Sequence, residues 1–154
     1  LLARLERVGV SVQYLTLHVG PGTFRPLRVE RVEEHRMEAE PIDIPGPTAH
    51  AVQEAKREGR GVIAVGTTTT RALEWAAAAD GRVRAGAGPA DLFIRPGHRF
   101  RVVDALVTNF HLPRSSLLVL VSAFAGRETV LAAYGHAVEA RYRFYSYGDA
   151  MLIH

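Results

Sequence analysis

A glycine and four threonines follow a short apolar run in VIAVGTTTTRALE, at residues 62–74, a pattern that suits an anion-binding site. A helix starting after the glycine would present free N–H groups and partial positive charge, and threonine hydroxyls add donors. Arginine supplies a planar fork for a carboxylate or phosphate. We expect a polar-ligand site here, although a threonine-rich helix cap with its arginine in solvent fits the pattern equally well. The residues concerned are Gly66, Thr67, Thr68 and Arg71.

Two polar side chains interrupt an apolar run in ALVTNFHLPRSS, at residues 105–116. Asn109 and His111 lie at the end of a predicted strand, where α/β folds commonly hold ligand groups. Pro113 enforces a turn, and either of the serines that end the stretch can cap the next helix. We expect a ligand-holding corner; the alternative is that Asn109 closes a turn and His111 is a satisfied, partly buried residue.

A Gly-Pro-Gly sequence ends the predicted strand in LTLHVGPGTF, at residues 15–24. Strand alternation places His18 on the side opposite to its apolar neighbours Leu17 and Val19, which we expect in the core. Gly20 and Gly22 can take backbone angles that other residues avoid. The stretch therefore predicts either a ligand-facing loop or a tight turn with a surface histidine.

Arginines alternate with aromatic residues in RYRFYSYGD, at residues 141–149. Arginine side chains bind phosphates and aromatic faces stack on bases, so Arg141 and Arg143 could contact RNA. If the segment is a strand, half of these side chains pack in the core instead.

The elements that must position these residues alternate between helix and strand. We expect helices over 1–10, 47–59, 66–79, 115–126 and 127–142, strands over 10–19, 24–32, 37–45, 61–65, 92–94 and 100–107, a glycine-rich loop over 80–89 and a hairpin-like segment over 143–154. This order favours an α/β fold with a mixed, partly parallel sheet and flanking helices, in a single domain over 1–154.

Composition limits the class of protein. The 154 residues are 47% hydrophobic and 23% charged, with no cysteine, which excludes disulfides and thiolate metal sites. No apolar run approaches a membrane span, so we expect no membrane partner and a cytoplasmic location. The net charge of +3 permits a nucleic-acid partner without requiring one. The uncapped helix at Leu1 suggests a fragment that lacks an N-terminal part. The acidic and histidine residues of 33–40 resemble an exposed strand face, and we assign no metal site.

Several long motifs together resemble the S-adenosylmethionine:tRNA ribosyltransferase-isomerase family of queuosine biosynthesis, essentially from end to end of the chain. The strings TNFHLP and SYGDAM are long and specific. Glu38 departs from the family, which usually has a histidine there. The motifs that carry the resemblance are, in order, LTLHVGPGTFRPLRV, VIAVGTTTTRALE, FRVVDALVTNFHLPRSSLLVLVSAFAG and YRFYSYGDAMLI.

The resemblance implies a two-domain fold, an α/β domain plus a β-barrel, of which this chain supplies most of the α/β part. It also implies that S-adenosylmethionine is the ribosyl-donating substrate, with no metal, and that the acceptor is 7-aminomethyl-7-deazaguanine at the wobble position of tRNA. The product would be epoxyqueuosine in tRNA, with adenine and methionine released. We expect a monomer at full length and no activity from this chain alone. The alternatives are a non-catalytic RNA-binding module and a nucleotide-binding domain of unrelated chemistry.

Histidine suits a general base near neutral pH, so His18 and His111 are the candidate bases. Asp149 could orient a base, bind a ribose hydroxyl or hold the sulfonium. Threonines and arginine of the first motif would bind the methionine carboxylate or a tRNA phosphate, and aromatic residues would stack a base. The candidate substrate-binding residues are Gly20, Gly22, Thr23, Phe24, Gly66, Thr67, Thr68, Arg71, Asn109, Ser115, Arg143 and Tyr147.

Overall fold

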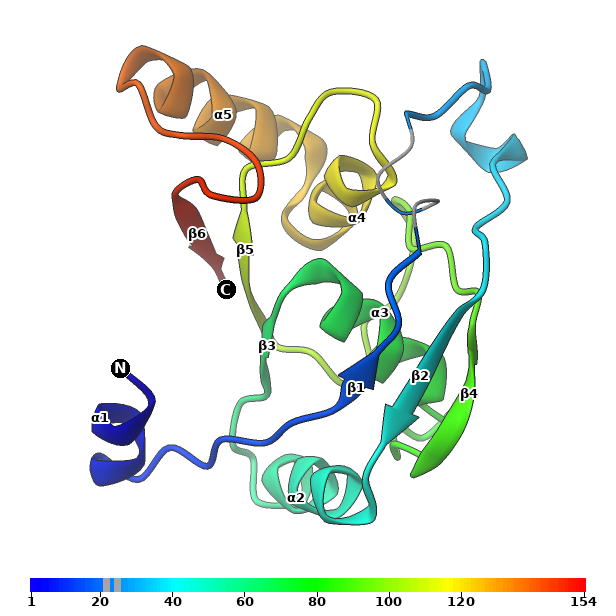
Figure 1. The fold of residues 1–154 in the computed structure, drawn as a ribbon, viewed down its shortest axis with the longest axis vertical. Coiled ribbons are helices and arrows are strands. Elements are labelled where there is room, and N and C mark those ends of the chain that lie inside the picture. Colours follow the sequence, from blue (N-terminus) through cyan, green and yellow to red (C-terminus); the bar gives the residue numbers. More distant parts are fainter. Residues whose placement is uncertain (21–22, 24–25) are drawn as a thin grey trace.

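The structure, a computed structural model, describes residues 1–20, 23 and 26–154; the predictions for Gly22 and Phe24 lie outside these residues. In the described part, the chain forms two three-stranded sheets with helices around them (Figure 1). The elements are α1 (Leu2–Arg7), β1 (Thr16–Leu17), η2 (Val32–Glu34), β2 (Glu40–Ile44), α2 (Gly46–Arg57), β3 (Ile63–Val65), α3 (Thr67–Ala76), β4 (Gly86–Ala90), β5 (Ala105–Asn109), α4 (Ser116–Ala125), α5 (Arg127–Glu139) and β6 (Ala150–Ile153).

The predicted α/β class with a partly parallel sheet is confirmed, but the strands divide between two sheets. In one, β3 and β5 are parallel and β6 pairs antiparallel with β5. Because β3 and β5 run in the same direction, Gly66 and Asn109 lie at the same edge of this sheet. The Gly66 N–H extends the pairing by donating to the Val107 carbonyl at 2.8 Å. This edge therefore brings the first two sequence motifs together.

The second sheet, β1-β2-β4, is antiparallel throughout. Its strand β4 occupies part of the segment that we expected to be a loop, and that expectation is wrong. The indole ring of Trp75 on α3 lies over Gly88, and a Cβ there would collide with the ring. Glycine in this strand thus permits close packing on α3, which the local sequence does not reveal.

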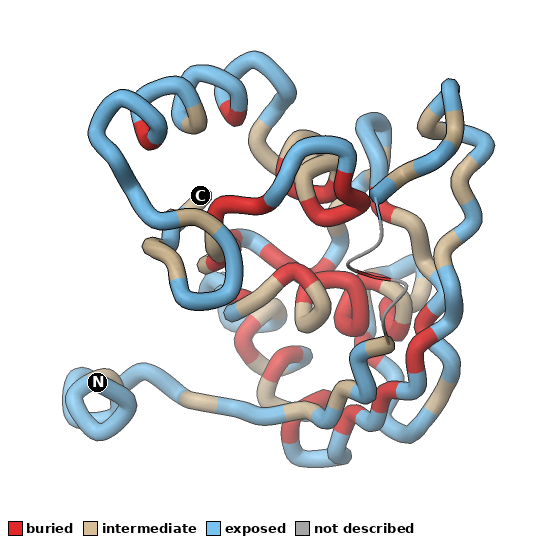
Figure 2. Tube along the Cα trace, turned by 45° about the horizontal axis from the view of Figure 1, so that its top comes forward, coloured by how far each residue is buried: buried red, intermediate tan, exposed pale blue. Residues whose placement is uncertain are grey.

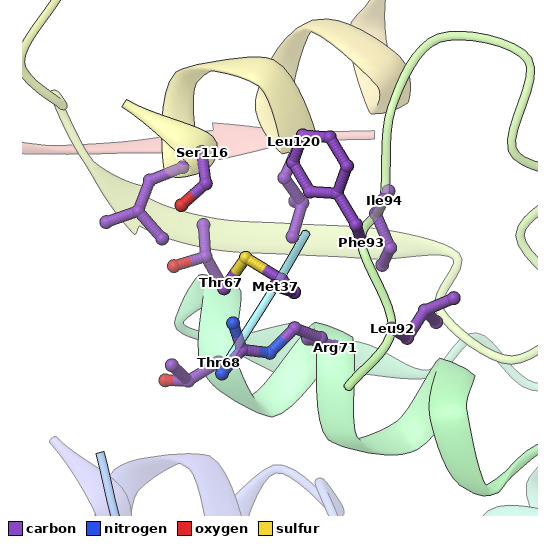
Figure 3. A pocket seen from close by; sticks show the side chains of 10 residues that line it. Met37, Thr67, Thr68, Arg71, Leu92, Phe93, Ile94, Ser116 and Leu120 are labelled. Carbon is purple, nitrogen blue, oxygen red and sulfur yellow. The ribbon is translucent and has the colours of Figure 1, made fainter. Parts of the chain in front are cut away.

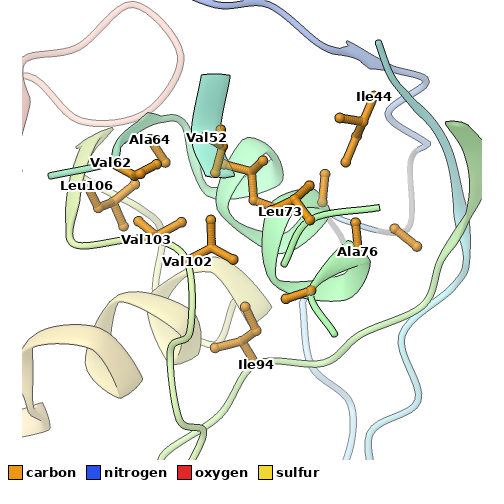
Figure 4. Close-up of a cluster of buried hydrophobic side chains, with 14 of the residues drawn as sticks. Ile44, Val52, Val62, Ala64, Leu73, Ala76, Ile94, Val102, Val103 and Leu106 are labelled. Atoms are coloured by element: carbon orange, nitrogen blue, oxygen red, sulfur yellow. The ribbon is translucent and has the colours of Figure 1, made fainter. Parts of the chain in front are cut away.

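Helix α3 lies between the two sheets and contacts β3 and β5 on one side and β4 on the other (Figure 1). Figure 2 shows the buried residues concentrated around this helix, whereas α1 is largely exposed. Aliphatic side chains from α3 and the surrounding elements fill the core (Figure 4), among them Ile44, Leu73, Val102 and Leu106. The core thus holds the N-terminus of α3 against the edge where β3 and β5 end.

Helices α2 to α5 confirm the periodicity predictions, but several predicted strands are wrong or too long. The strand expected over 10–19 is reduced to β1, and Val19, expected in the core, is 44% exposed. Of the described residues in 24–32, Pro26 forms only an isolated bridge with Ser115. The expected hairpin of 143–154 is also wrong, because β6 pairs with β5 instead.

The strand expected over 92–94 is absent, and Glu74 explains why the strand expected over 100–107 does not include residues 101–103. Its buried carboxylate accepts the backbone N–H groups of Arg101, Val102 and Val103, each at 2.9 Å. These donors are therefore unavailable for a sheet ladder.

Among the described residues, no single helix is long and apolar enough to cross a membrane. Helices α4 and α5 taken together have the length and composition of a membrane span, but the chain bends by 114° between them.

Replacing Glu74 by alanine is expected to lower the free energy of unfolding by at least about 3 kcal/mol, because three N–H groups lose their acceptor. Urea unfolding measures the change. Glu139→Ala, at the exposed end of α5, is the control and should change stability by less than about 0.5 kcal/mol. Equal effects of the two substitutions would contradict the assigned role of Glu74.

Candidate functional site

A cleft of about 300 Å³ collects residues from all four of the motifs that the sequence singled out. Its walls come from the segment after β1, the start of α3, the end of β5 with the corner that follows, the first turn of α4 and the loop before β6. This volume is at the small end of ligand pockets. The lining residues are Val19, Thr23, Gly66, Thr67, Thr68, Thr108, Asn109, His111, Leu117, Tyr145 and Ser146.

His111 is a buried imidazole in the wall of this cleft, with 7% of its surface exposed. Its Nε2 lies 3.0 Å from the Thr108 hydroxyl, and its backbone N–H donates to the Tyr134 hydroxyl oxygen at 2.8 Å. Burial lowers the pKa of His111 from 6.5 to about 4, so the ring is neutral at physiological pH. Burial also raises the pKa of Tyr134, so its hydroxyl stays protonated.

The low pKa of His111 predicts a pH dependence of stability. Between pH 6.5 and about 4 the unfolded chain takes up a proton on His111 that the folded chain does not, so stability falls as the pH falls through this window. On lowering the pH from 7 to 4, the wild type should lose about 3 kcal/mol more than a His111→Gln variant, as measured by urea unfolding at each pH. Parallel pH profiles for the two proteins would contradict the buried, neutral imidazole.

An aromatic cluster fixes the corner that carries His111. The Phe110 ring packs against Tyr134, Tyr142 and Phe144, with centroids 5.3, 5.8 and 5.2 Å away. Two of the aromatic residues from the C-terminal motif therefore pack at this corner. The motif forms no strand, however, and none of its aromatic residues is fully buried, so the core alternative for that motif is wrong.

Ser115 fixes the other side of the same corner by capping α4. Its hydroxyl accepts the Leu118 N–H at 3.1 Å and donates to the Leu112 carbonyl at 2.8 Å. This confirms a capping serine at the start of α4, and Ser115 is not among the residues that line the cleft. Its predicted contact with substrate stays a prediction.

The N-terminus of α3 meets the cleft through Gly66, Thr67 and Thr68. Gly66 has φ of +97° at the N-cap position, a backbone conformation that favours glycine, and no threonine side chain caps the helix. The two threonines also border a small neighbouring cavity of about 10 Å³, space for about one water molecule (Figure 3). The first backbone N–H groups of α3 thus lie beside the cleft, where a negative group would be favoured.

Arg71 is buried, which contradicts the alternative interpretation that placed its side chain in solvent. Its side chain is 6% exposed and forms an ion pair with Glu40 of β2. Glu40 belongs to the stretch 33–40 that we expected on an exposed strand face, and that expectation is wrong for Glu40, which is buried. It borders the small cavity shown in Figure 3 and is not among the residues of the larger cleft. A direct contact between Arg71 and a substrate anion stays a prediction.

The loop before β6 supplies another part of the cleft wall, through Tyr145 and Ser146. The Asn109 amide nitrogen donates to the carbonyls of Gly148 at 3.5 Å and Asp149 at 3.2 Å. The Asp149 carboxylate accepts the Arg143 backbone N–H at 2.7 Å and its guanidinium at 3.0 Å. These bonds lower the pKa of Asp149 and raise that of Arg143. The side chains of Arg143 and Asp149 therefore pair with each other and join the two ends of the loop.

The remaining candidates have different positions. His18 is exposed, as strand alternation predicted, and it does not belong to the residues that line the cleft. Gly20 does not adopt the positive φ that favours glycine, so it does not use the backbone freedom that the sequence offered there. Tyr147 is 96% exposed; it lies on the same loop as Tyr145 and Ser146, which line the cleft. Among the described residues, no cluster of three or more His, Asp or Glu side chains is placed to hold a metal ion.

The chain is similar to several known proteins. Residues 1–153 match the family model described as Queuosine biosynthesis protein. The chain is 61% identical over 153 residues to the S-adenosylmethionine:tRNA ribosyltransferase-isomerase of Geobacter sulfurreducens, covering 99% of this chain and 45% of that protein. It is 60% identical over 153 residues to the enzyme of the same name from Cupriavidus pinatubonensis, covering 99% of this chain and 44% of that protein.

A solved structure is also similar. The crystal structure of S-adenosylmethionine tRNA ribosyltransferase from Thermotoga maritima superposes with a TM-score of 0.81 at 44% identity, covering 99% of this chain and 48% of that one. The chain therefore spans less than half the length of these relatives.

Proposed function

The chain belongs to the queuosine biosynthesis protein family, and on this premise we propose that its cleft binds S-adenosylmethionine as a ribosyl donor for tRNA. In the full-length protein the ribosyl group would be transferred to 7-aminomethyl-7-deazaguanine at the wobble position and isomerised to epoxyqueuosine. Adenine and methionine would leave. The names of the relatives support this proposal, and so does the convergence of four family motifs on one cleft.

We assign the proton transfers of this reaction to His111. The positive sulfur of S-adenosylmethionine acidifies the adjacent ribose C–H, and departing adenine needs a proton. Because the imidazole of His111 is neutral, it can accept the proton from this C–H without first losing a proton of its own. The protonated ring would then pass that proton to adenine. Thr108, 3.0 Å from Nε2, would hold the ring in place.

The methionine carboxylate would bind at the start of α3. Arg71 is already neutralised by Glu40, so the remaining positive potential at this wall comes from the free N–H groups of the helix. The hydroxyls of Thr67 and Thr68 add donors beside them. The exposed Tyr147 ring, on the loop before β6, is available to stack on a base of tRNA.

Adenine release tests the proposal. Full-length protein would be incubated with adenine-labelled S-adenosylmethionine and tRNA that carries the precursor base. Release of adenine that depends on this tRNA supports the proposal. Binding of tRNA without adenine release would support an RNA-binding module instead, and S-adenosylmethionine turnover without tRNA would indicate unrelated chemistry. The same preparation would show by its sedimentation whether the protein is a monomer, as we propose.

A further inference from the structure

We propose that Glu40 is a positioning residue of the cleft, which acts by holding Thr23 and the backbone of Gly20 against α3. This proposal rests on the proposed function, because it assigns to Glu40 a role in shaping the S-adenosylmethionine site. Glu40 itself does not line the cleft described above.

The Glu40 carboxylate makes several contacts at once. One oxygen, Oε1, accepts the Thr23 hydroxyl at 2.6 Å and the Gly20 backbone N–H at 2.9 Å. The other, Oε2, forms the ion pair with Arg71. Both charged side chains are 6% exposed, so water screens this pair weakly.

Thr23 is the point where this network reaches the cleft. Thr23 is 1% exposed and borders the cleft. Its hydroxyl also accepts a hydrogen bond from Arg71 Nη1 at 3.3 Å, and its carbonyl accepts one from the Ser116 hydroxyl at 3.3 Å. The segment after β1, the start of β2, α3 and the start of α4 are thereby joined at a single residue of the cleft wall.

A buried ion pair contributes little net stability, because desolvation offsets most of the attraction between the charges. Apolar residues would fill the same space about as well, but they could not accept the Gly20 N–H and the Thr23 hydroxyl. We therefore infer that the pair fixes the position of this wall relative to the N-terminus of α3. The ligand sulfonium and carboxylate would need that spacing, since small displacements of binding groups reduce catalysis strongly.

The test uses two variants of the full-length protein. Glu40→Gln keeps the shape of the side chain but leaves Arg71 charged and unpaired, and Glu40→Gln/Arg71→Met removes both charges. In the double variant, which leaves no buried charge unpaired, we expect the melting temperature to stay close to that of the wild type. The KM for S-adenosylmethionine should rise by about tenfold or more, while kcat and the Kd for tRNA change by less than about threefold.

The exposed pair Glu54 and Arg57 on α2 provides the matched control, Glu54→Gln/Arg57→Met, which should leave all three constants unchanged. An unchanged KM in the folded double variant would overturn the proposal, and so would a loss confined to kcat. If neither variant folds, Glu40→Asp replaces them: it keeps the charge but is too short to hold both partners, and the same rise in KM is expected.

Amide hydrogen exchange at Gly20 separates this proposal from the proposed function. In a Glu40→Leu/Arg71→Met variant, which lacks the acceptor oxygen that glutamine would still offer, exchange of the Gly20 amide should accelerate by about tenfold or more, whatever reaction the protein catalyses. If the wild type releases no adenine but this acceleration is found, the proposed function fails and the positioning contact stands. Unchanged exchange would overturn the positioning role even in an active enzyme.

Discussion

In the full-length protein, replacing His111 by alanine is expected to reduce turnover by about 100-fold or more. The affinity for tRNA should change by less than about threefold, because phosphate contacts elsewhere dominate it. His111 lies in the cleft wall as a buried, neutral imidazole, and alanine cannot accept or donate the proton. Single-turnover kinetics and a tRNA-binding titration measure the two quantities separately.

Because alanine also leaves a cavity, His111→Gln is the companion variant; it preserves much of the volume and cannot carry a proton. It should lose turnover to a similar extent. His50→Ala, on the exposed side of α2, is the control and should retain full turnover. Unchanged turnover in the His111 variants, or equal losses of turnover and tRNA affinity, would remove His111 from the catalytic residues.

Replacing Gly148 by alanine is expected to lower kcat/KM for S-adenosylmethionine by about 100-fold. A Cβ at this position would collide with the Arg143 carbonyl oxygen and the Phe144 backbone, which cannot move aside as a flexible side chain can. The loop before β6 must therefore shift, and it carries Tyr145 and Ser146 of the cleft wall. Steady-state kinetics with saturating tRNA measures the loss.

Gly135→Ala is the matched control for this substitution. Gly135 lies within α5, where an added methyl group meets no atom within 4 Å, so alanine should stabilise the helix by up to about 1 kcal/mol without altering kinetics. Similar kinetics for the two glycine variants would mean that the position of the loop does not matter for the reaction.

Local patterns predicted most of the helices and the strands next to them. Apolar periodicity located α2 to α5, and Gly59 and Gly126 end α2 and α4 with φ of +69° and +85°. The sequence failed where distant residues decide the structure. The glycine-rich segment forms a strand by pairing with β2, with Trp75 packed over Gly88, and the pairing of β6 with β5 replaces a local hairpin.

The candidate site shows the same limit. Gly66 and His111 were predictable because each follows the end of a strand in a parallel pair. Tyr145 and Ser146 reach the cleft through contacts with distant residues, because the Tyr145 N–H donates to the Phe110 carbonyl and the Asn109 amide donates to the Asp149 carbonyl. The partner of Arg71 was equally hidden, since Glu40 stands in a charged stretch that suggests an exposed strand face.

The central claim is that one cleft, built from these separate motifs, holds the sulfonium donor. A crystal structure of the full-length protein with S-adenosylmethionine tests it most directly. We expect the ligand to lie between the N-terminus of α3 and His111, with its carboxylate at Thr67 and Thr68. A ligand bound elsewhere, with this cleft filled only by solvent, would contradict it.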